Sequence, residues 1–321
     1  MELSFLTPLA GLFVVLALAP LLVYRARERR LREVRGALRL EEPSQRSQLF
    51  LVAAMAGICA LLALAAAQPV VATTRKLPER TDAQVFMVLD TSRSMHASLG
   101  RDEPTRFQRG RAIALAVRDA LPEVPMGLAS MTDGVLPHLF PTTDRRVFIQ
   151  TSEDSIDIER PPPSFSATIA TSLEGLRNVP RQNYFAPAAK KRVLIVLSDA
   201  ESRPLEDPGE FDEAFQKKPE IATIFVRLWD EEERIYLTGV PEVGYEPDPT
   251  SGAQLEQTAE LIDAQVISES EAGNLPAMVA DLVGDGPTFD REHEGRRRAL
   301  MPWITLLAIL PLGSVLRRRN V

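Results

Sequence analysis

Three oxygen-bearing side chains stand at alternate positions in residues 85–95, which read VFMVLDTSRSM. Asp90 supplies a carboxylate, and Ser92 and Ser94 supply hydroxyls. The five residues before Asp90 are apolar, so we expect a buried strand that ends at this carboxylate. Oxygen ligands gathered at the end of a strand could bind a hard divalent cation such as Mg²⁺.

A second apolar run, residues 192–198 (RVLIVLS), ends directly before Asp199. Ligands of parallel sheets bind at the carboxyl ends of the strands, so we expect Asp90 and Asp199 at the same edge. An alternative explanation needs no metal. In it, Ser92 and Ser94 cap the following turn and Asp90 accepts backbone N–H bonds, which is ordinary at strand ends.

Strands and helices alternate from residue 84 to residue 283. Thr105 can cap a helix, Asp133-Gly134 indicates a hairpin turn, and the segment 229–252 suggests an inserted surface hairpin. The expected elements are strands at 84–90, 125–131, 135–140, 192–198, 221–228 and 265–268, and helices at 106–121, 145–152, 253–263 and 274–283. This order predicts an α/β protein with a doubly wound, mostly parallel, Rossmann-like sheet.

Three long apolar stretches flank this region. Residues 3–24, 49–67 and 299–316 contain no charged residue and are 22, 19 and 18 residues long. Each is long enough to cross a bilayer, so we predict three transmembrane helices in addition to the α/β domain. Pro302 and Pro311 interrupt the third stretch, for which a buried or interfacial helix is the alternative.

The distribution of charge predicts an orientation. Eleven arginines lie outside the central segment, at positions 25, 27, 29, 30, 32, 35, 39, 46, 317, 318 and 319. The positive-inside rule places them in the cytoplasm and the central segment outside. Arg296, Arg297 and Arg298 would then lie on the outer side, which opposes this orientation, but they are outnumbered.

The central segment, residues 75–298, is acidic. It contains 26 Lys+Arg and 39 Asp+Glu, a net charge of −13, which argues against binding to nucleic acid. The only cysteine, Cys59, lies in the second apolar stretch, so an intrachain disulfide is excluded.

The chain is thus predicted to be a multi-pass protein of the inner or cell membrane. In chain order we expect transmembrane helix 1 at 1–24, a basic cytoplasmic loop at 25–48, transmembrane helix 2 at 49–67, a linker at 68–83, the α/β domain at 84–283, a second linker at 284–298, transmembrane helix 3 at 299–316 and a cytoplasmic tail at 317–321.

The D-x-S-x-S sequence after the first strand, the later MGLASM and VLIVLSDA, and the order of elements resemble the von Willebrand factor type A (VWA) domain. The resemblance covers residues 84–283. It implies a metal-ion-dependent adhesion site, abbreviated MIDAS. Asp90, Ser92 and Ser94 match the first metal loop of that site, and Asp199 matches the third.

The second metal loop departs from the family pattern G-T-x-I-G-x-A-L. The matching residues 166–173 read SATIATSL, which places Ala167 where the family has threonine. Either the loop shifts by one residue and Thr168 supplies the hydroxyl, or the site lacks a ligand. We take Thr168 as the fifth ligand. The glycine that usually follows the third-loop aspartate is replaced by Ala200.

A complete site of this kind implies bound Mg²⁺, with Mn²⁺ or Ca²⁺ as substitutes, and an open position for an Asp or Glu carboxylate of a partner protein. We expect a protein-interaction module and not an enzyme. No serine or cysteine is paired with a histidine at catalytic spacing, and no glycine-rich phosphate-binding loop occurs.

The arrangement of two spans, then this domain, then a third span resembles that of the Bat-type (aerotolerance) membrane proteins of bacteria. That resemblance implies a role in an envelope assembly or stress-related complex, with MoxR-type AAA+ ATPases and other VWA proteins as partners. A cytoplasmic ATPase would have to contact the basic loop or the tail. The alternative function is a metal-independent accessory or scaffold subunit of a membrane enzyme or transporter.

Overall fold

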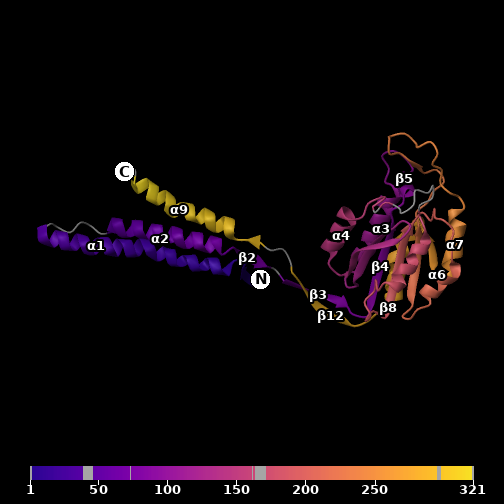
Figure 1. Cartoon of the computed structure of the whole chain (residues 1–321), viewed down its shortest axis with the longest axis horizontal. Helices are drawn as coiled ribbons and strands as arrows, with labels where there is room; N and C mark the ends of the chain where they lie inside the picture. Colours follow the sequence, from indigo (N-terminus) through magenta and orange to yellow (C-terminus); the bar gives the residue numbers. More distant parts are fainter. Residues whose placement is uncertain are drawn as a thin grey trace. The chain divides into compact units, whose positions relative to one another are not determined.

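The computed structural model describes residues 2–38, 46–72, 74–160, 162, 171–294 and 298–319. The chain forms two compact units. One, the helical unit, consists of Met1–Lys76 and Glu292–Val321, and the other, the sheet unit, consists of Leu77–Arg291. Figure 1 labels the elements of both.

The sheet unit is built on a six-stranded sheet with the order β11-β9-β8-β4-β6-β7. Neighbouring strands are parallel except β7, which is antiparallel to β6. The strands are β4 (Ala83–Asp90), β6 (Met126–Met131), β7 (Val135–Thr142), β8 (Lys191–Ser198), β9 (Ile221–Arg227) and β11 (Gln265–Ser268). The structure therefore confirms the predicted mostly parallel α/β sheet.

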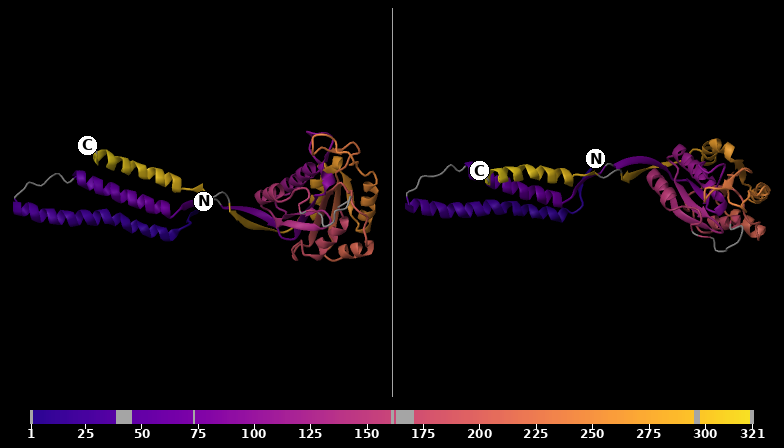
Figure 2. Two further views of the ribbon diagram at one scale, coloured as in Figure 1. Left: turned by 45° about the horizontal axis from the view of Figure 1, so that its top comes forward. Right: turned by 90° about the horizontal axis from the view of Figure 1, so that it is seen from above.

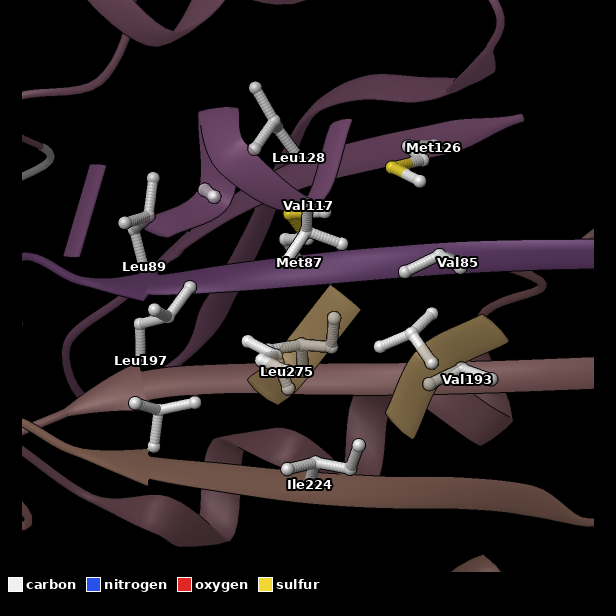
Figure 3. Packing of buried hydrophobic residues seen from close by; sticks show 14 of the residues in the cluster. Val85, Met87, Leu89, Val117, Met126, Leu128, Val193, Leu197, Ile224 and Leu275 are labelled. Atoms are coloured by element: carbon white, nitrogen blue, oxygen red, sulfur yellow. The ribbon is translucent and has the colours of Figure 1, made fainter. Parts of the chain in front are cut away.

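Strand β4 is central because its side chains are apolar on both faces of the sheet. Val85, Met87 and Leu89 belong to one buried cluster, and Phe86 and Val88 belong to another. All five are fully buried. Successive residues of a strand point to opposite faces, so one continuous apolar run serves both cores. Figure 3 shows the first cluster, in which Val117 and Leu275 pack near Met87.

Helices cover both faces of this sheet (Figure 1). Apolar residues of α3 (Arg106–Ala120), α4 (Arg145–Asp154) and α8 (Leu275–Val283) complete the first cluster. Residues of the 3-10 helix η3 (Leu173–Arg177), α5 (Asn178–Arg181), α6 (Pro208–Phe215) and α7 (Ser251–Leu261) complete the second. The sheet is thus doubly wound, as the alternation of elements predicts.

Local signals account for several element boundaries. Thr105 and Gln108 form a reciprocal capping box that begins α3, since each side chain bonds the backbone N–H of the other residue. The Asp133-Gly134 turn joins β6 to β7 as an antiparallel pair. Both features follow the expectation from sequence.

The segment 229–252 differs from the inserted hairpin that we expected. Its strand β10 (Arg234–Ile235) pairs with β5 (Ala97–Ser98), which lies shortly after the D-x-S-x-S loop. The pairing is long-range, so the pattern of residues within the segment carries no sign of it. The segment is therefore attached to the first metal loop and is not a free-standing hairpin.

In the helical unit, the first apolar stretch is not a single helix. Its start, β1 (Glu2–Phe5), is a strand, and Pro8 begins the 3-10 helix η1 (Pro8–Ala17) that leads into α1 (Leu18–Leu38). Helix α1 continues through much of the segment predicted to be a loop at 25–48. Arginine is a good helix former, so the change from apolar to basic residues does not end the helix.

Helix α2 (Arg46–Ala66) contacts η1, α1 and α9 (Met301–Arg319). Figure 2 shows these helices running side by side. Two helices of the described chain are long and apolar enough to cross a membrane by length and composition, at Pro8–Leu31 and Leu49–Ala66. The apolar part of α9, Met301–Arg317, is shorter. The third predicted span therefore does not meet the criterion that the first two meet.

Both predicted linkers contain strands. In the first, β2 (Pro69–Ala72) pairs with β1 and with β13 (Arg298–Ala299), and β3 (Thr74–Arg80) pairs with β12 (Thr288–Glu294) from the second. Two extended chains that run antiparallel can satisfy each other's backbone groups. The Nη1 atom of Arg291 on β12 lies 2.8 Å from Oε1 of Glu79 on β3. The described parts of the predicted linkers 68–83 and 284–298 thus contain paired strands.

Candidate metal centre

Asp90 is the last residue of β4, and its side chain is fully buried. Its Oδ1 accepts a hydrogen bond from the backbone N–H of Ser92 at 2.8 Å. Its Oδ2 accepts a hydrogen bond from the hydroxyl of Ser198 at 2.5 Å. Ser198 ends the neighbouring strand β8, so two adjacent strand ends hold this carboxylate in place.

Ser92 and Ser94 flank the start of a short 3-10 helix, η2 (Arg93–His96). Their Oγ atoms lie 3.0 Å apart. Ser92 stands at the N-cap position of η2, but its side chain makes no capping hydrogen bond. The metal-free explanation is thus correct for Asp90, which accepts a backbone N–H bond, and incorrect for the hydroxyl of Ser92, which does not cap.

Asp199 follows the end of β8 and is also fully buried. Its Oδ2 lies 2.9 Å from Nη1 of Arg106, and its Oδ1 accepts a hydrogen bond from the backbone N–H of Glu201 at 3.0 Å. The next residue, Ala200, has φ of 62°, a left-handed conformation that glycine adopts at lower cost. The backbone geometry here explains the glycine of the family pattern.

The proposed fifth ligand, Thr168, lies outside the described residues, and so does Ala167. The described part of this loop begins at Thr171, which is buried like Ser172. The N–H of Ser172 donates to the carbonyl of Thr132 at 2.8 Å, and the N–H of Arg203 donates to the carbonyl of Thr171 at 3.0 Å. The end of the second loop therefore lies between the β6 turn and the segment after Asp199, and the choice of Thr168 stays a prediction.

The structure brings Asp90, Ser92, Ser94 and Asp199 together at the carboxyl edge of the sheet, as predicted. Burial and the neighbouring Asp199 carboxylate raise the pKa of Asp90 to about 7 from an ordinary value of 3.8. Within the described chain no group of three or more His, Cys, Asp or Glu residues could hold a metal. A cation here would depend on hydroxyls as well as carboxylates, and these are the oxygen ligands that Mg²⁺ prefers.

Arg106, the first residue of α3, was not predicted as part of the site. Its fully buried guanidinium bonds four partners through two nitrogens. Nη1 lies 2.9 Å from Asp199 Oδ2, 2.8 Å from Glu201 Oε1 and 2.9 Å from the Tyr245 hydroxyl, and Nε lies 2.5 Å from Glu233 Oε2. Burial alone would lower the pKa of Arg106, but the surrounding Asp199, Tyr245, Glu201 and Glu233 raise it above its ordinary value.

One signal in the sequence could have indicated this role. A cation in the first turn of a helix opposes the helix dipole, so it is favourable there only beside acidic groups. Arg106 directly follows the capping residue Thr105. Its acidic partners lie 93 to 127 residues away along the chain, and no local pattern points to them.

Two carboxylates at the ends of adjacent parallel strands, with D-x-S-x-S between strand and helix, agree with the comparison to known families. A family model of the von Willebrand factor type A domain matches residues 85–201. The chain contains a VWA domain. The match includes the first metal loop and Asp199, and the rest of the sheet unit completes the fold around it.

Two solved structures resemble the VWA domain of this chain. One is the conserved hypothetical protein BatB from Bacteroides thetaiotaomicron, with a TM-score of 0.50 and 16% identity, over 62% of this chain and 98% of that one. The other is an aerotolerance-related membrane protein from Bacteroides fragilis, with a TM-score of 0.50 and 15% identity, over 63% and 98%. At these identities the similarity is one of fold. A search of curated protein sequences found no match.

Proposed function

We propose that this protein is a membrane-anchored VWA module that binds Mg²⁺ at a MIDAS-type site and, through the metal, a carboxylate of a partner protein. One observation carries the proposal. Asp90 and Asp199 are both fully buried at the ends of adjacent strands. Of these two carboxylates, only Asp199 is bonded to a cationic side chain within the described chain. A divalent cation would compensate Asp90.

The donor set suits Mg²⁺, with Mn²⁺ or Ca²⁺ as substitutes. Asp90 and Asp199 supply carboxylates, and Ser92, Ser94 and Thr168 supply hydroxyls. Mg²⁺ keeps several waters and needs few protein carboxylates, so one coordination position remains for an external ligand. Ser94 is the less buried of the two serines, which leaves the side of the site next to it open to a partner.

We place the domain on the outer side of the inner or cell membrane, and the arginines of the 25–46 segment and of residues 317–319 on the cytoplasmic side. The two apolar helices and the likeness of fold to an aerotolerance-related membrane protein support anchoring. A MoxR-type AAA+ ATPase would reach this protein through its cytoplasmic segments, and other VWA proteins through the domain. The net charge of the domain disfavours nucleic acid, and we assign it no catalytic activity of its own.

The test is a titration of the full chain in nanodiscs with Mn²⁺, followed by electron paramagnetic resonance, with Mg²⁺ as competitor. We expect one saturable site that Mg²⁺ displaces and that Asp90→Asn abolishes. Asp102→Asn, a change at an exposed aspartate twelve residues after the end of β4, is the matched control and should bind Mn²⁺ normally. Equal binding by the Asp90 variant and the unmutated chain would contradict the proposal.

A second function remains open because of the Arg106–Asp199 ion pair. In that pair the guanidinium of Arg106 compensates the buried charge of Asp199 without a metal. Such compensation is what a site with a purely structural role would need. In this alternative the protein is a metal-independent accessory or scaffold subunit of a membrane enzyme or transporter. Absence of Mn²⁺ binding by the unmutated chain would favour it.

A further inference from the structure

The loop between β10 and α7 exposes apolar side chains at its tip. Leu237 is 56% exposed, Val240 63% and Val243 101%. We call these three residues the apolar tip. Single exposed aliphatic residues are common on soluble proteins, but three within seven residues form a patch of the kind that marks interaction sites.

The apolar tip stands on a loop that is held at several points. The N–H of Gly239 donates to the carbonyl of Tyr236 at 2.9 Å, and the N–H of Glu242 donates to the carbonyl of Ile235 at 2.9 Å. Ile235 belongs to β10, which pairs with β5. Figure 1 shows the loop, in orange, beside β5. The loop therefore cannot turn its apolar side chains inward without losing these bonds.

Two contacts tie this loop to the proposed metal site. Nη2 of Arg93, the residue between Ser92 and Ser94, lies 2.9 Å from Oε2 of Glu242. Glu242 directly precedes Val243, so a member of the apolar tip is one residue away from a contact with the first metal loop. This ion pair is half exposed, and so its main effect is on position and not on stability.

The second contact is at the far end of the loop. The Tyr245 hydroxyl lies 2.9 Å from Nη1 of Arg106, and it donates to Oε1 of Glu201 at 3.0 Å. Arg106 also holds Asp199, the third-loop ligand. The loop is thus attached to both metal loops, at Glu242 and at Tyr245, and Val243 of the apolar tip lies between these two attachments in the chain.

We propose that the apolar tip and the metal site form one docking surface, which binds a protein segment that carries an Asp or Glu flanked by large apolar residues. The inference rests on the proposed function, because the carboxylate of that segment would ligate the metal. The metal would supply the polar contact, and Leu237, Val240 and Val243 would supply the apolar contacts that a specific interface needs around it.

The charge around the apolar tip favours a protein over a membrane surface. Glu242 lies within the tip, and the exposed residues Asp230, Glu231 and Glu232 precede β10. Carboxylates next to an apolar patch are repelled by anionic lipid headgroups, whereas lipid-binding segments are rich in Lys and Arg. Two basic side chains also lie here: Arg93 of the first metal loop, which is half exposed and pairs with Glu242, and Arg101, whose guanidinium lies beside Gly239. They suit a partner that carries a carboxylate.

The experiment uses the full chain in nanodiscs with saturating Mn²⁺ and two fluorescent nine-residue peptides. One peptide carries a single Asp flanked by Leu residues, and the other carries the same Asp flanked by Ser. We expect the Leu-flanked peptide to bind more tightly to the unmutated chain. The triple variant Leu237→Ser, Val240→Ser, Val243→Ser should lose about tenfold in affinity for that peptide and bind the Ser-flanked peptide as before.

A matched control replaces exposed apolar residues elsewhere. Leu136 and Phe140 on β7 are 44% and 60% exposed, and their change to Ser should leave peptide binding unaltered. The Mn²⁺ affinity of every variant is measured alongside, so that failure of the metal site is seen separately. Equal binding of the two peptides, no binding of either below about 1 mM, or equal binding by the triple variant would each overturn the proposal.

Insertion into lipid is tested with a bimane probe at Val243→Cys, in a Cys59→Ala background, in nanodiscs that contain doxyl-labelled lipid. We expect no quenching in the absence of peptide, and a change of bimane emission when the Leu-flanked peptide binds. Strong quenching by the labelled lipid would assign the apolar tip to the membrane surface and overturn the proposal.

Discussion

The Nη1 atom of Arg106 lies 2.9 Å from Oδ2 of Asp199, and neither side chain is exposed to solvent. One of the two carboxylates expected to bind the metal therefore already has a fixed cation. Among the described residues, the partners of Asp90 are hydrogen-bond donors, namely the hydroxyl of Ser198 and the backbone N–H of Ser92. The negative charge of Asp199 is therefore compensated by a cation, and within the described chain the negative charge of Asp90 is not.

Replacement of Arg106 with Gln should tighten metal binding and weaken the metal-free fold. The change leaves Asp199, Glu201 and Glu233 buried without their main cation, which costs about 3 kcal/mol or more of unfolding free energy. A divalent cation then becomes the nearest compensating charge. We expect Mn²⁺ affinity to rise about tenfold, and Mg²⁺ to raise the melting temperature more in the variant than in the unmutated chain.

Arg109 provides the control, because it lies one turn along α3 and bonds Glu233 and Glu269 but has no bond to Asp199 among those described. Arg109→Gln should lower stability less, since this side chain is partly exposed, and should leave Mn²⁺ affinity unchanged. If both variants bind Mn²⁺ like the unmutated chain, Arg106 does not compete with the metal for Asp199.

The titration of Asp90 predicts a dependence of stability on pH. Burial and Asp199 raise its pKa in the folded state to about 7, above the ordinary value of 3.8, so between these values the folded state binds the proton more tightly. The metal-free protein should therefore lose stability as pH rises from about 4 to about 7, and this contribution should level off above that. Thermal denaturation in a chelator, measured across this range, checks the prediction.

Asp90→Asn removes the titrating group and should flatten the pH dependence over the same range. Metal binding should show the opposite trend in the unmutated chain, because Mg²⁺ must displace the proton from Asp90. Affinity is expected to increase as pH rises toward 7. A slope of stability against pH that is unchanged by Asp90→Asn would assign the titration to other groups.

Ser198→Ala tests how the strand end holds Asp90. The hydroxyl donates to Asp90 at 2.5 Å and accepts a hydrogen bond from the N–H of Ala200 at 2.9 Å, so both partners lose a bond in a buried place. We expect a loss of about 1–3 kcal/mol of unfolding free energy above pH 7, where Asp90 is charged, as measured by chemical denaturation.

The comparison for this variant is Ser152→Ala, which removes a buried hydroxyl that donates to a neutral carbonyl, that of Ile149, at 2.7 Å. Hydrogen bonds to charged groups are the stronger ones, so the loss at Ser198 should exceed the loss at Ser152 and should shrink at lower pH. Equal, pH-independent losses would show that Ser198 is merely a packing residue.

The sequence predicted the sheet well because its signals are local. The run 85–89 is apolar on both faces, so a central strand was expected at 84–90, and β4 begins one residue earlier, at Ala83. Asp90 and Asp199 follow two such runs, and topology alone brings their ends together. Arg106 could not be found in this way, because the residues that bind it come from three segments distant along the chain.

The boundaries of the helical unit were less predictable for a related reason. The change from apolar to charged residues predicts where a helix would leave a membrane, but it does not predict where the helix ends. Helix α1 therefore continues to Leu38 through its arginines. Within the predicted linkers, β3 and β12 form a pair because two distant segments, around Glu79 and Arg291, meet. Pairing between segments some 200 residues apart leaves no trace in the composition of either one.

The close approach of β4 and β6 gives a final prediction about stability. A Cβ atom on Gly127 of β6 would lie 2.5 Å from the ring of Phe86 and 2.8 Å from the carbonyl oxygen of Leu139, and the latter cannot yield without moving β7. Gly127→Ala should therefore cost about 1–3 kcal/mol of unfolding free energy, whereas Gly134→Ala, with nothing within 4 Å, should cost less. Phe86 and Gly127 each lie four residues before the carboxyl ends of their strands, where Asp90 is, so Mn²⁺ affinity should stay unchanged while the melting temperature falls. Equal stability of the two variants in chemical denaturation would show that the strands separate easily at this position.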